Sequence, residues 1–314
     1  MVGWILYHRP PAGQPSASYG VRRLLEAGER LGVQLRIVAP EDLEVIVTRN
    51  DRKSVLLEGE HVPLPNFILP RLGAHTHYFA LAMIRHLEHL GVHAFNTSHA
   101  IEMVRDKLYT QQVLAESDVP VPKTMLAKSK VDVDLVERTL GFPVILKTLS
   151  GLKGSGVYLA EDRENFENIM DLITSTNEKV NLILQEFVAD SRGRDLRVFV
   201  VGGQPIAAMV RKSAGKNFRS NFSKGGTVEP FEITPEVAWL SSEICRRLKL
   251  DIAGIDLLFH GDHFQVCEAN SSPGFEGLEQ CTDLDIANEV LHYVLIRLGA
   301  FDLASKAENF RQRV

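Results

Sequence analysis

Short apolar runs alternate with longer amphipathic stretches in the first part of the chain, a pattern typical of strands and helices that follow one another. The apolar runs predict strands at Val2–Tyr7, Leu35–Val38, Val45–Val47, Val55–Leu57 and Asn66–Leu69. Helical spacing predicts one helix through Val21, Leu24, Leu25 and Leu31, ended by Gly32, and another through Phe79, Met83, Ile84, Leu87 and Leu90, ended by Gly91. This first unit ends near Ser98.

The same alternation continues to the end of the chain. A helical connector is predicted over Ile101–Glu116, and Pro120 and Pro122 then force an extended entry into the next strand. Further strands are predicted at Thr124–Ala127, Val144–Thr148, Val157–Ala160, Leu182–Phe187, Leu196–Val201, Ile206–Arg211, Ala253–Phe259 and Phe264–Ala269. Further helices are predicted around Phe166–Ile173, Val237–Leu248 and Ile286–Leu298. The order indicates an α/β or α+β protein, which we divide into residues 1–98, 99–187, 188–300 and a peripheral tail, 301–314.

Composition indicates an ordinary globular protein. The 314 residues are 45% hydrophobic and 24% charged, with a net charge of -5. This mild acidity gives no sign of general nucleic-acid binding, for which a basic face is expected. Cys245, Cys267 and Cys281 lack the spacing of a zinc knuckle, so we expect buried, reduced thiols in a cytoplasmic protein. The start of the chain, Met1–Tyr7, lacks the basic region of a signal peptide, and no apolar run is long enough to cross a bilayer.

A predicted hairpin turning at Gly261-Asp262 carries the most informative polar residues. Glu268 and Asn270 share a face of the return strand because they are two residues apart. A two-residue turn pairs Asp256 with position 267 and separates it from Glu268, whereas a three-residue loop or one bulge brings the two carboxylates together. The carboxylates with an amide oxygen would suit Mg²⁺ or Mn²⁺ carrying phosphates; otherwise they line an exposed strand face.

A glycine-rich stretch, Ser150–Gly156, follows the strand that contains Lys147. Its backbone N–H groups could lie over phosphates that the lysine ammonium also reaches. The stretch is not a P-loop because a strand follows it rather than a helix, and a plain turn is the competing interpretation. Gln185–Val188 ends another strand, where backbone groups could bind an adenine edge; a plain strand end is the competing interpretation.

Cations are dense in one region: Arg192, Arg194, Arg197, Arg211, Lys212, Lys216, Arg219 and Lys224. Such a run is usually solvated, but Arg219-Ser220-Asn221 in an acidic chain also suits a carboxylate substrate. Arg71, in a turn after a strand, could face the same cleft. His75, His77 and His99 lie at helix starts and suit surface or capping roles, and no Ser-His-Asp or Cys-His order favours nucleophilic hydrolysis.

In their order and spacing these motifs resemble those of the ATP-grasp ligases. The resemblance rests on Val104–Lys107, Pro120-x-Pro122, Val144–Lys147 with Gly151–Gly156, Gln185-Glu186, Asp256 and Glu268–Gly274. The chain closely resembles the RimK-like branch at Pro70–Gly73, Asp195–Arg197, Phe218–Asn221 and Gly274–Glu279. Members of that branch add α-linked glutamate to the C-terminus of a ribosomal protein.

The resemblance implies an ATP-grasp fold, in which an N-terminal α/β domain, a central lid and a C-terminal sheet domain clamp ATP. It implies ATP contacts at Lys107, Lys147, Gly151, Gly154, Ser155, Gly156, Gln185, Glu186, Phe187, Val188 and Asp195. It implies substrate contacts at Arg71, Arg219, Ser220, Asn221 and Ser271, and two Mg²⁺ or Mn²⁺ ions on Asp256, Glu268 and Asn270. The catalytic cations would be Lys147 and Arg211, the latter stabilising the transferring phosphoryl group. Lys153 stands where the family commonly has glutamine.

The implied reaction turns a carboxylate into an acylphosphate with ATP and joins it to an amine, releasing ADP and phosphate. The expected substrates are L-glutamate and the C-terminal carboxylate of a protein or peptide. The alternatives are a small-molecule or carrier-protein acceptor, a kinase that stops at the phosphorylated substrate, or a non-catalytic nucleotide-binding module. No direct contact with nucleic acid or membrane is expected, and a homo-oligomer is compatible with the resemblance.

Overall fold

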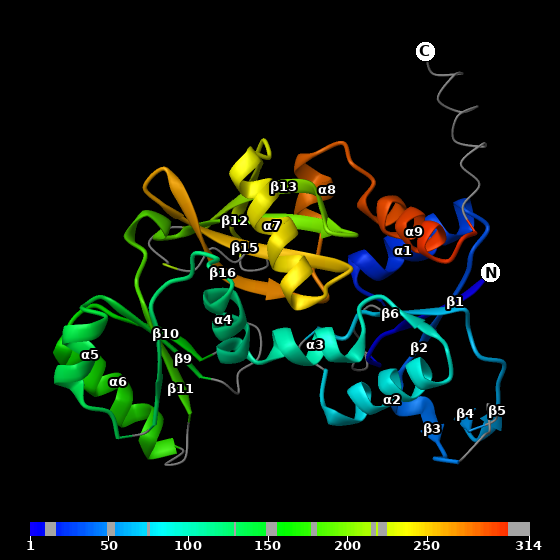
Figure 1. The fold of residues 1–314 in the computed structure, drawn as a ribbon, viewed down its shortest axis with the longest axis horizontal. Coiled ribbons are helices and arrows are strands. Elements are labelled where there is room, and N and C mark those ends of the chain that lie inside the picture. The colour runs from blue at the N-terminus through cyan, green and yellow to red at the C-terminus, as the bar shows by residue number, and fades with distance from the viewer. Residues whose placement is uncertain are drawn as a thin grey trace.

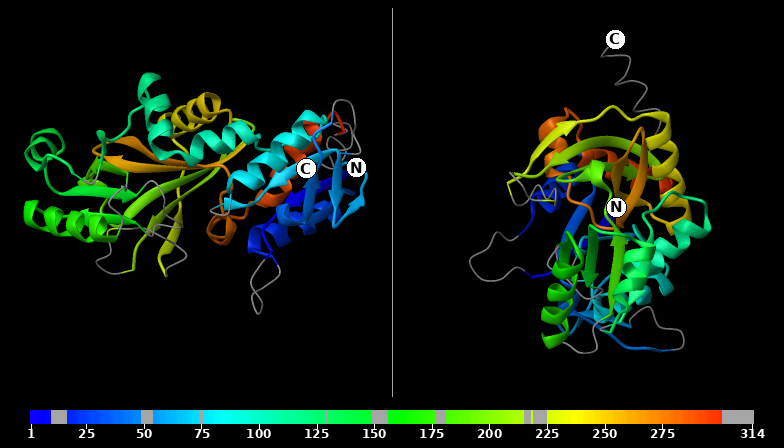
Figure 2. Two further views of the ribbon diagram at one scale, coloured as in Figure 1. Left: turned by 90° about the horizontal axis from the view of Figure 1, so that it is seen from below. Right: turned by 90° about the vertical axis from the view of Figure 1, so that its left-hand side faces the viewer.

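The structure is a computed structural model that describes residues 1–9, 17–48, 54–73, 76–128, 130–148, 156–176, 181–214, 218 and 225–300. The described strands form an N-terminal parallel sheet, a small sheet beside it, a central antiparallel sheet and a C-terminal antiparallel sheet. The N-terminal and central sheets lie at opposite ends of the molecule, with the C-terminal sheet between them (Figures 1 and 2). Among the described residues, no helix is both long and apolar enough to span a bilayer.

The N-terminal sheet has the strand order β2-β1-β6-β7, with all neighbours parallel. Its strands are β1 (Val2–Leu6), β2 (Gln34–Val38), β6 (Phe67–Pro70) and β7 (His93–Ala94), and its helices are α1 (Tyr19–Arg30) and α2 (Tyr78–His89). A short 3-10 turn, η1 (Pro40–Asp42), leads to the small antiparallel sheet of β3 (Leu43–Val45), β4 (Val55–Leu57) and β5 (Glu60–His61). The strand predicted at Val45–Val47 therefore begins and ends earlier, because Ile46 and Val47 are exposed.

The central sheet follows two helices, α3 (Ser98–Arg105) and α4 (Lys107–Glu116). Its strand order is β10-β9-β11-β8, from β8 (Thr124–Ala127), β9 (Val144–Thr148), β10 (Val157–Ala160) and β11 (Leu182–Glu186). Helices α5 (Val133–Thr139) and α6 (Arg163–Thr176) share an apolar core with the even-numbered residues of β9 and β11, such as Leu146 and Leu184. Since side chains alternate along a strand, Lys147 and Gln185 face the opposite side.

The C-terminal sheet has the order β14-β13-β12-β15-β16 and is antiparallel throughout. Its elements, after the 3-10 turn η3 (Ala189–Ser191), are β12 (Arg194–Val201), β13 (Gln204–Lys212), β14 (Thr227–Pro230), β15 (Ile252–His260) and β16 (His263–Asn270). Helix α7 (Pro235–Leu248) and the helices α3 and α4 share an apolar core with one face of the sheet, to which β12 contributes residues such as Leu196 and Val198.

The other face of the C-terminal sheet has two chemically different ends. Phe199 and Val201 of β12 belong to a core shared with Phe67 of the N-terminal sheet and with Val21 of α1. Two residues earlier on the same face of β12, Arg197 makes an ion pair instead. Strand alternation therefore gives this face an apolar end against the N-terminal sheet and a charged end toward the central sheet.

The last helices attach the C-terminal region to the N-terminal one. Helix α9 (Ile286–Arg297) lies beside α1 (Figure 1), and α8 (Glu276–Cys281) precedes it. Glu279 accepts hydrogen bonds from the Tyr19 hydroxyl at 2.7 Å and from Arg23 Nε at 2.8 Å. Arg30 pairs with Asp285 at 2.6 Å. This contact joins residues from the first and last parts of the chain. The domain boundaries at 98, 187 and 300 stay a prediction.

Several sequence expectations need correction. The connector predicted as one helix over Ile101–Glu116 is two helices, because Asp106 leaves the helical conformation and its side chain accepts from Tyr109 N at 3.0 Å to cap α4. The strands β5, β7 and β14 and the helices α5 and α8 have no counterpart among the predicted elements. All three cysteines are free, but only Cys245 is fully buried. The predicted tail, 301–314, lies outside the described residues.

We expect Leu291→Ala to destabilise the protein by about 2–5 kcal/mol, because Leu291 is fully buried in the core shared by α1 and α9. Ile296→Ala, in the same helix but 52% exposed, serves as the control and should change stability by about 0.5 kcal/mol or less. Urea unfolding of both variants measures the difference. Equal losses would contradict this packing of α9.

Candidate active site

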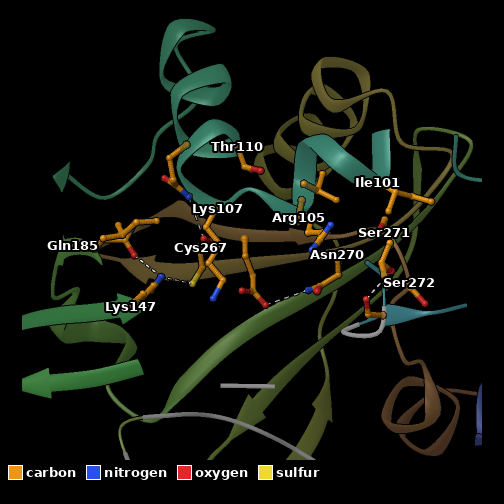
Figure 3. Close-up of a pocket in the computed structure, with 17 residues that line it drawn as sticks. Ile101, Arg105, Lys107, Thr110, Lys147, Gln185, Cys267, Asn270, Ser271 and Ser272 are labelled. Atoms are coloured by element: carbon orange, nitrogen blue, oxygen red, sulfur yellow. Dashed lines mark hydrogen bonds between the residues drawn. The ribbon is translucent and has the colours of Figure 1, made fainter. Parts of the chain in front are cut away.

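Two cavities lie between the central and C-terminal sheets. The larger has a volume of about 600 Å³. Its apolar lining comes from Ile145, Val157, Phe187, Val188, Phe218 and Leu258, and its charged lining from Lys107, Lys147, Glu186, Arg194, Asp195, Arg197, Arg211, Asp256 and Glu268. The smaller, of about 300 Å³, shares Lys107, Lys147, Gln185, Cys267 and Glu268 with it (Figure 3). The two cavities adjoin at these shared residues and together make up the cleft of the site.

A β-bulge brings the two carboxylates of the hairpin together. The turn holds two residues, since His260 pairs with His263, and Asp256 nevertheless pairs with Glu268. The register shifts between Asp256 and Leu257, so that Cys267 is the extra residue on β16. Of the two registers left open by the sequence, the bulged one is correct.

Asp256 is the centre of a buried ion network. It is only 3% exposed, and Arg197 donates to both of its carboxylate oxygens. Arg211 Nη2 lies 2.9 Å from Asp256 Oδ2 and also pairs with Asp195 at 2.6 Å. Burial alone would raise the pKa of Asp256, but the charges and hydrogen bonds of Arg197 and Arg211 outweigh it and lower the pKa to about 2. The network holds two cations and two anions, so its charges balance.

Glu268 adds a further carboxylate beside this balanced network. Asn270 Nδ2 donates to Glu268 Oε1 at 3.2 Å, and in the described part of the chain Glu268 makes no ion pair. Its charge is therefore not neutralised there by a protein cation. Among the described residues, no three His, Cys, Asp or Glu side chains are arranged so that they alone could hold a metal ion. Two carboxylates and one amide oxygen still fit Mg²⁺ or Mn²⁺, since Mg²⁺ commonly takes its other ligands from water and phosphate.

Lys147 is held on the opposite wall of the cleft. Its Nζ donates to Gln185 Oε1 at 2.6 Å and lies 3.9 Å from the Cys267 sulfur (Figure 3). Gln185 is itself buried and donates to Thr124 Oγ1 at 2.9 Å. The Glu186 carboxylate accepts from Lys123 N at 2.9 Å. The lysine ammonium is therefore fixed by a chain of hydrogen bonds that begins in β8.

The cleft brings most of the predicted site residues together. Those that line at least one cavity are Lys107, Lys147, Gln185, Glu186, Phe187, Val188, Asp195, Arg211, Asp256, Glu268, Asn270 and Ser271. Gly151, Gly154, Ser155, Arg219, Ser220 and Asn221, with Lys153 and His75, lie outside the described residues. Gly156 is described and has a φ of +89°, and a Cβ there would lie 2.2 Å from Thr148 Oγ1, so this turn requires glycine. The predicted roles of all these residues stay predictions.

Arg71 holds the loop that follows β16. It lines neither cavity, and its Nη2 donates to the Pro273 carbonyl at 2.5 Å while the guanidinium lies 5.9 Å above the Phe275 ring. Burial lowers its pKa to about 10. In the structure Arg71 therefore supports the loop, and its contact with substrate stays a prediction. Of the histidines, His77 caps α2 through Ala80 N at 3.4 Å and His99 is exposed, which confirms their expected roles.

Two residues without a predicted role support the site. One is Arg197, which binds Asp256. The other is the fully buried Asn96, whose Nδ2 donates to the carbonyls of Ile252 at 2.7 Å and Ser271 at 2.9 Å. Its Oδ1 accepts from the amides of Asp251 at 2.6 Å and Ile252 at 3.0 Å. Asn96 thus ties the start of β15 to the end of β16. Its place just before the helix-capping Thr97 gave no signal of this, because its partners lie far away in the sequence.

The fold and the cleft define the class of protein. A charged site between two antiparallel sheets is typical of ATP-grasp enzymes. The family model for the RimK-like ATP-grasp domain matches residues 104–294, and that for the RimK PreATP-grasp domain matches residues 13–101. The chain therefore belongs to the RimK-like ATP-grasp family.

Curated relatives and solved structures agree with this assignment. The chain is 34% identical over 278 residues to a probable alpha-L-glutamate ligase 1 of Shewanella amazonensis, covering 88% of this chain and 91% of that protein. It is 36% identical over 277 residues to a probable alpha-L-glutamate ligase of Hydrogenovibrio crunogenus, with the same coverage of 88% and 91%. The ATP-grasp ligase PsnB, in a complex with a precursor variant, Mg and ADP, has a similar fold, with a TM-score of 0.72 at 17% identity, over 95% of this chain and 98% of that one. A D-alanine–D-alanine ligase of Bacillus anthracis reaches a TM-score of 0.63 at 14% identity, over 95% and 96%.

We expect Asn96→Ala to destabilise the protein by about 2 kcal/mol or more, because it leaves buried backbone groups without partners, each costing about 1–3 kcal/mol. Asn66→Ala is the matched control, since Asn66 accepts one hydrogen bond, from Val2 N at 2.9 Å, at an exposed position. Urea unfolding compares the two variants. Equal stability of both would mean that Asn96 does not anchor β15 and β16.

Proposed function

We propose that this protein is an ATP-dependent ligase that adds L-glutamate to the C-terminal carboxylate of a protein or peptide and releases ADP and phosphate. The observation that carries the proposal is the bulged pair Asp256–Glu268, which lines the same cleft as Lys147. The activity named for the relatives, alpha-L-glutamate ligase, supports the choice of amino acid. The matching domains support an ATP-dependent ligase over a non-catalytic module or a kinase.

The larger cavity is suited to ATP. Its apolar walls, Ile145, Val157 and Leu258, would accept the adenine ring, and the backbone of Phe187 and Val188 would bind the adenine edge. Lys107 and Lys147 would receive the phosphates, with Gly151, Gly154, Ser155 and Gly156 of the glycine-rich stretch covering them. Asp195 would lie near the ribose while it keeps its ion pair with Arg211.

Asp256, Glu268 and Asn270 would hold the divalent ions that accompany the nucleotide. Bound Mg²⁺ or Mn²⁺ would neutralise part of the charge of the phosphates. Glu268 suits such an ion because its own charge is not paired with a cation of the described residues. Asp256 would also contact the metal, and Arg197 and Arg211 would hold its carboxylate in place. Arg211, which lines the cavity and is held by Asp195 and Asp256, would donate hydrogen bonds to the transferring phosphoryl group.

The reaction follows from these roles. The acceptor carboxylate attacks the γ-phosphorus of ATP, giving an acylphosphate and ADP. The amine of glutamate then attacks the acyl carbon, loses a proton, and phosphate leaves as the amide forms. Closure of the central domain over the cleft would keep water from the acylphosphate. Arg71, Arg219, Ser220, Asn221 and Ser271 remain the proposed contacts and supports of the substrates. We propose a cytoplasmic location and no direct binding to nucleic acid.

The proposal is tested by intact-mass analysis of a glutamate-ended peptide incubated with Mg-ATP and glutamate. We expect the peptide mass to rise in steps of one glutamate residue, with one ADP formed per step. ADP release with another amino acid alone would reject glutamate as the substrate. Phosphorylated peptide without a new amide would identify a kinase. No reaction with any amino acid would reject the proposal that the protein is a ligase.

We expect Glu268→Ala to lower this activity by about a hundredfold or more while the protein stays folded, because the proposed metal site loses a carboxylate. Glu102→Ala, an exposed position in α3 that lines neither cavity, is the control and should keep full activity. Circular dichroism checks the fold of both. Wild-type ligation by the Glu268 variant would reject the metal assignment.

A further inference from the structure

The smaller cavity extends the cleft past the residues that it shares with the larger one. Its own walls come from the end of α3, from α4, from Asn270 at the end of β16, and from Ser271 and Ser272, which follow that strand (Figure 3). Arg105, Asn270, Ser271 and Ser272 all line it. This chamber therefore adjoins Lys147 and Glu268 without sharing the apolar walls proposed for adenine.

Arg105 differs from the other arginines that line the cleft. Arg197 and Arg211 are both bound to Asp256, and Arg194 donates to the Asp190 carbonyl at 2.8 Å and stacks 4.5 Å from the Phe259 ring. Arg105 is exposed, and within the described part of the chain its guanidinium has no hydrogen-bond or ion-pair partner. A guanidinium at the wall of a cavity, with its donors unused, is suited to a carboxylate.

The charges of the cleft leave few other cations for such a ligand. Lys107 and Lys147 line both cavities and are the cations proposed for the phosphates of ATP. Glu268 is the carboxylate of the smaller cavity and is proposed to hold a metal ion. A glutamate whose amine reacts at the acylphosphate still carries two carboxylates, and the hydroxyls of Ser271 and Ser272 are neutral. Arg105 is the remaining cation among the described residues of this chamber.

We propose that the smaller cavity binds the incoming amino acid and that Arg105 pairs with one of its carboxylates. The inference rests on the proposed ligase function and adds a site and a residue to it. A purely structural role is the competing explanation, because Arg105 lies in the last turn of α3, where a positive charge favours the helix end. Arg105→Lys keeps that charge but loses the two-pronged hydrogen bonding of a guanidinium.

The experiment measures steady-state kinetics of the wild type, Arg105→Ala and Arg105→Lys with glutamate, ATP and a glutamate-ended peptide. We expect the KM for glutamate to rise about 10- to 100-fold in Arg105→Ala, the effect of losing one charge-assisted contact, and to rise partly in Arg105→Lys. The KM for ATP should stay within about twofold, since Arg105 lines only the smaller cavity. Arg85→Ala is the control, because Arg85 lies in α2 and lines neither cavity.

Two competing ligands then identify the carboxylate. Glutamine lacks the side-chain carboxylate and glutamate α-amide lacks the other. We expect the inhibition constant of only one of them to be the same in wild type and Arg105→Ala, namely the one without the group that Arg105 binds. An unchanged KM for glutamate in Arg105→Ala would overturn the role of Arg105. An equal loss of affinity for glutamate, glutamine, glutamate α-amide and ATP would overturn it as well. A wild type that adds no glutamate would instead reject the proposed function itself.

Discussion

The carboxylate of Asp256, buried between two arginines, is the interaction on which the cleft depends. Removing one partner of such a buried ion pair commonly costs about 3–5 kcal/mol, because the other charge is left without compensation. Arg197 and Arg211 come from the neighbouring strands β12 and β13, so the pair fixes the charged end of the C-terminal sheet. The bulge at Cys267 then determines that Glu268 stands beside Asp256. The site thus has a rigid wall in which the charge of Asp256 is neutralised by arginines, and Glu268 beside it is not paired with a cation of the described residues.

The N-terminal sheet supports this wall from the other end. One face of the C-terminal sheet changes from apolar at Phe199 to charged at Arg197, so packing against the N-terminal core and lining of the cleft are adjacent functions of one surface. Asn96 and Arg71 extend the support to the loop after β16 by binding the carbonyls of Ser271 and Pro273. The N-terminal region therefore contributes to the geometry of the site even where its own side chains line no cavity.

Much of the fold could be predicted from the sequence because its strands are short apolar runs between prolines and glycines. The strands at Thr124–Ala127, Val144–Thr148 and Val157–Ala160 have the predicted bounds. Helix α5 escaped prediction because Val136 is its only fully buried residue, and β14 because it is a largely exposed edge strand. The hairpin register needed the structure, since a bulge leaves no periodic signal. The resemblance to a known family indicated what the patterns alone could not, namely that several weak motifs belong to one site. The roles of Arg197 and Asn96 could not be predicted because their partners are distant in the sequence.

The central claim is that this cleft activates a carboxylate by phosphorylating it. The most direct measurement labels the C-terminal carboxylate of the acceptor peptide with oxygen-18 and follows the label during glutamate addition with Mg-ATP. If an acylphosphate forms, one labelled oxygen passes to inorganic phosphate for each amide made, and ADP is the nucleotide product. Unlabelled phosphate, or release of AMP in place of ADP, would contradict the account.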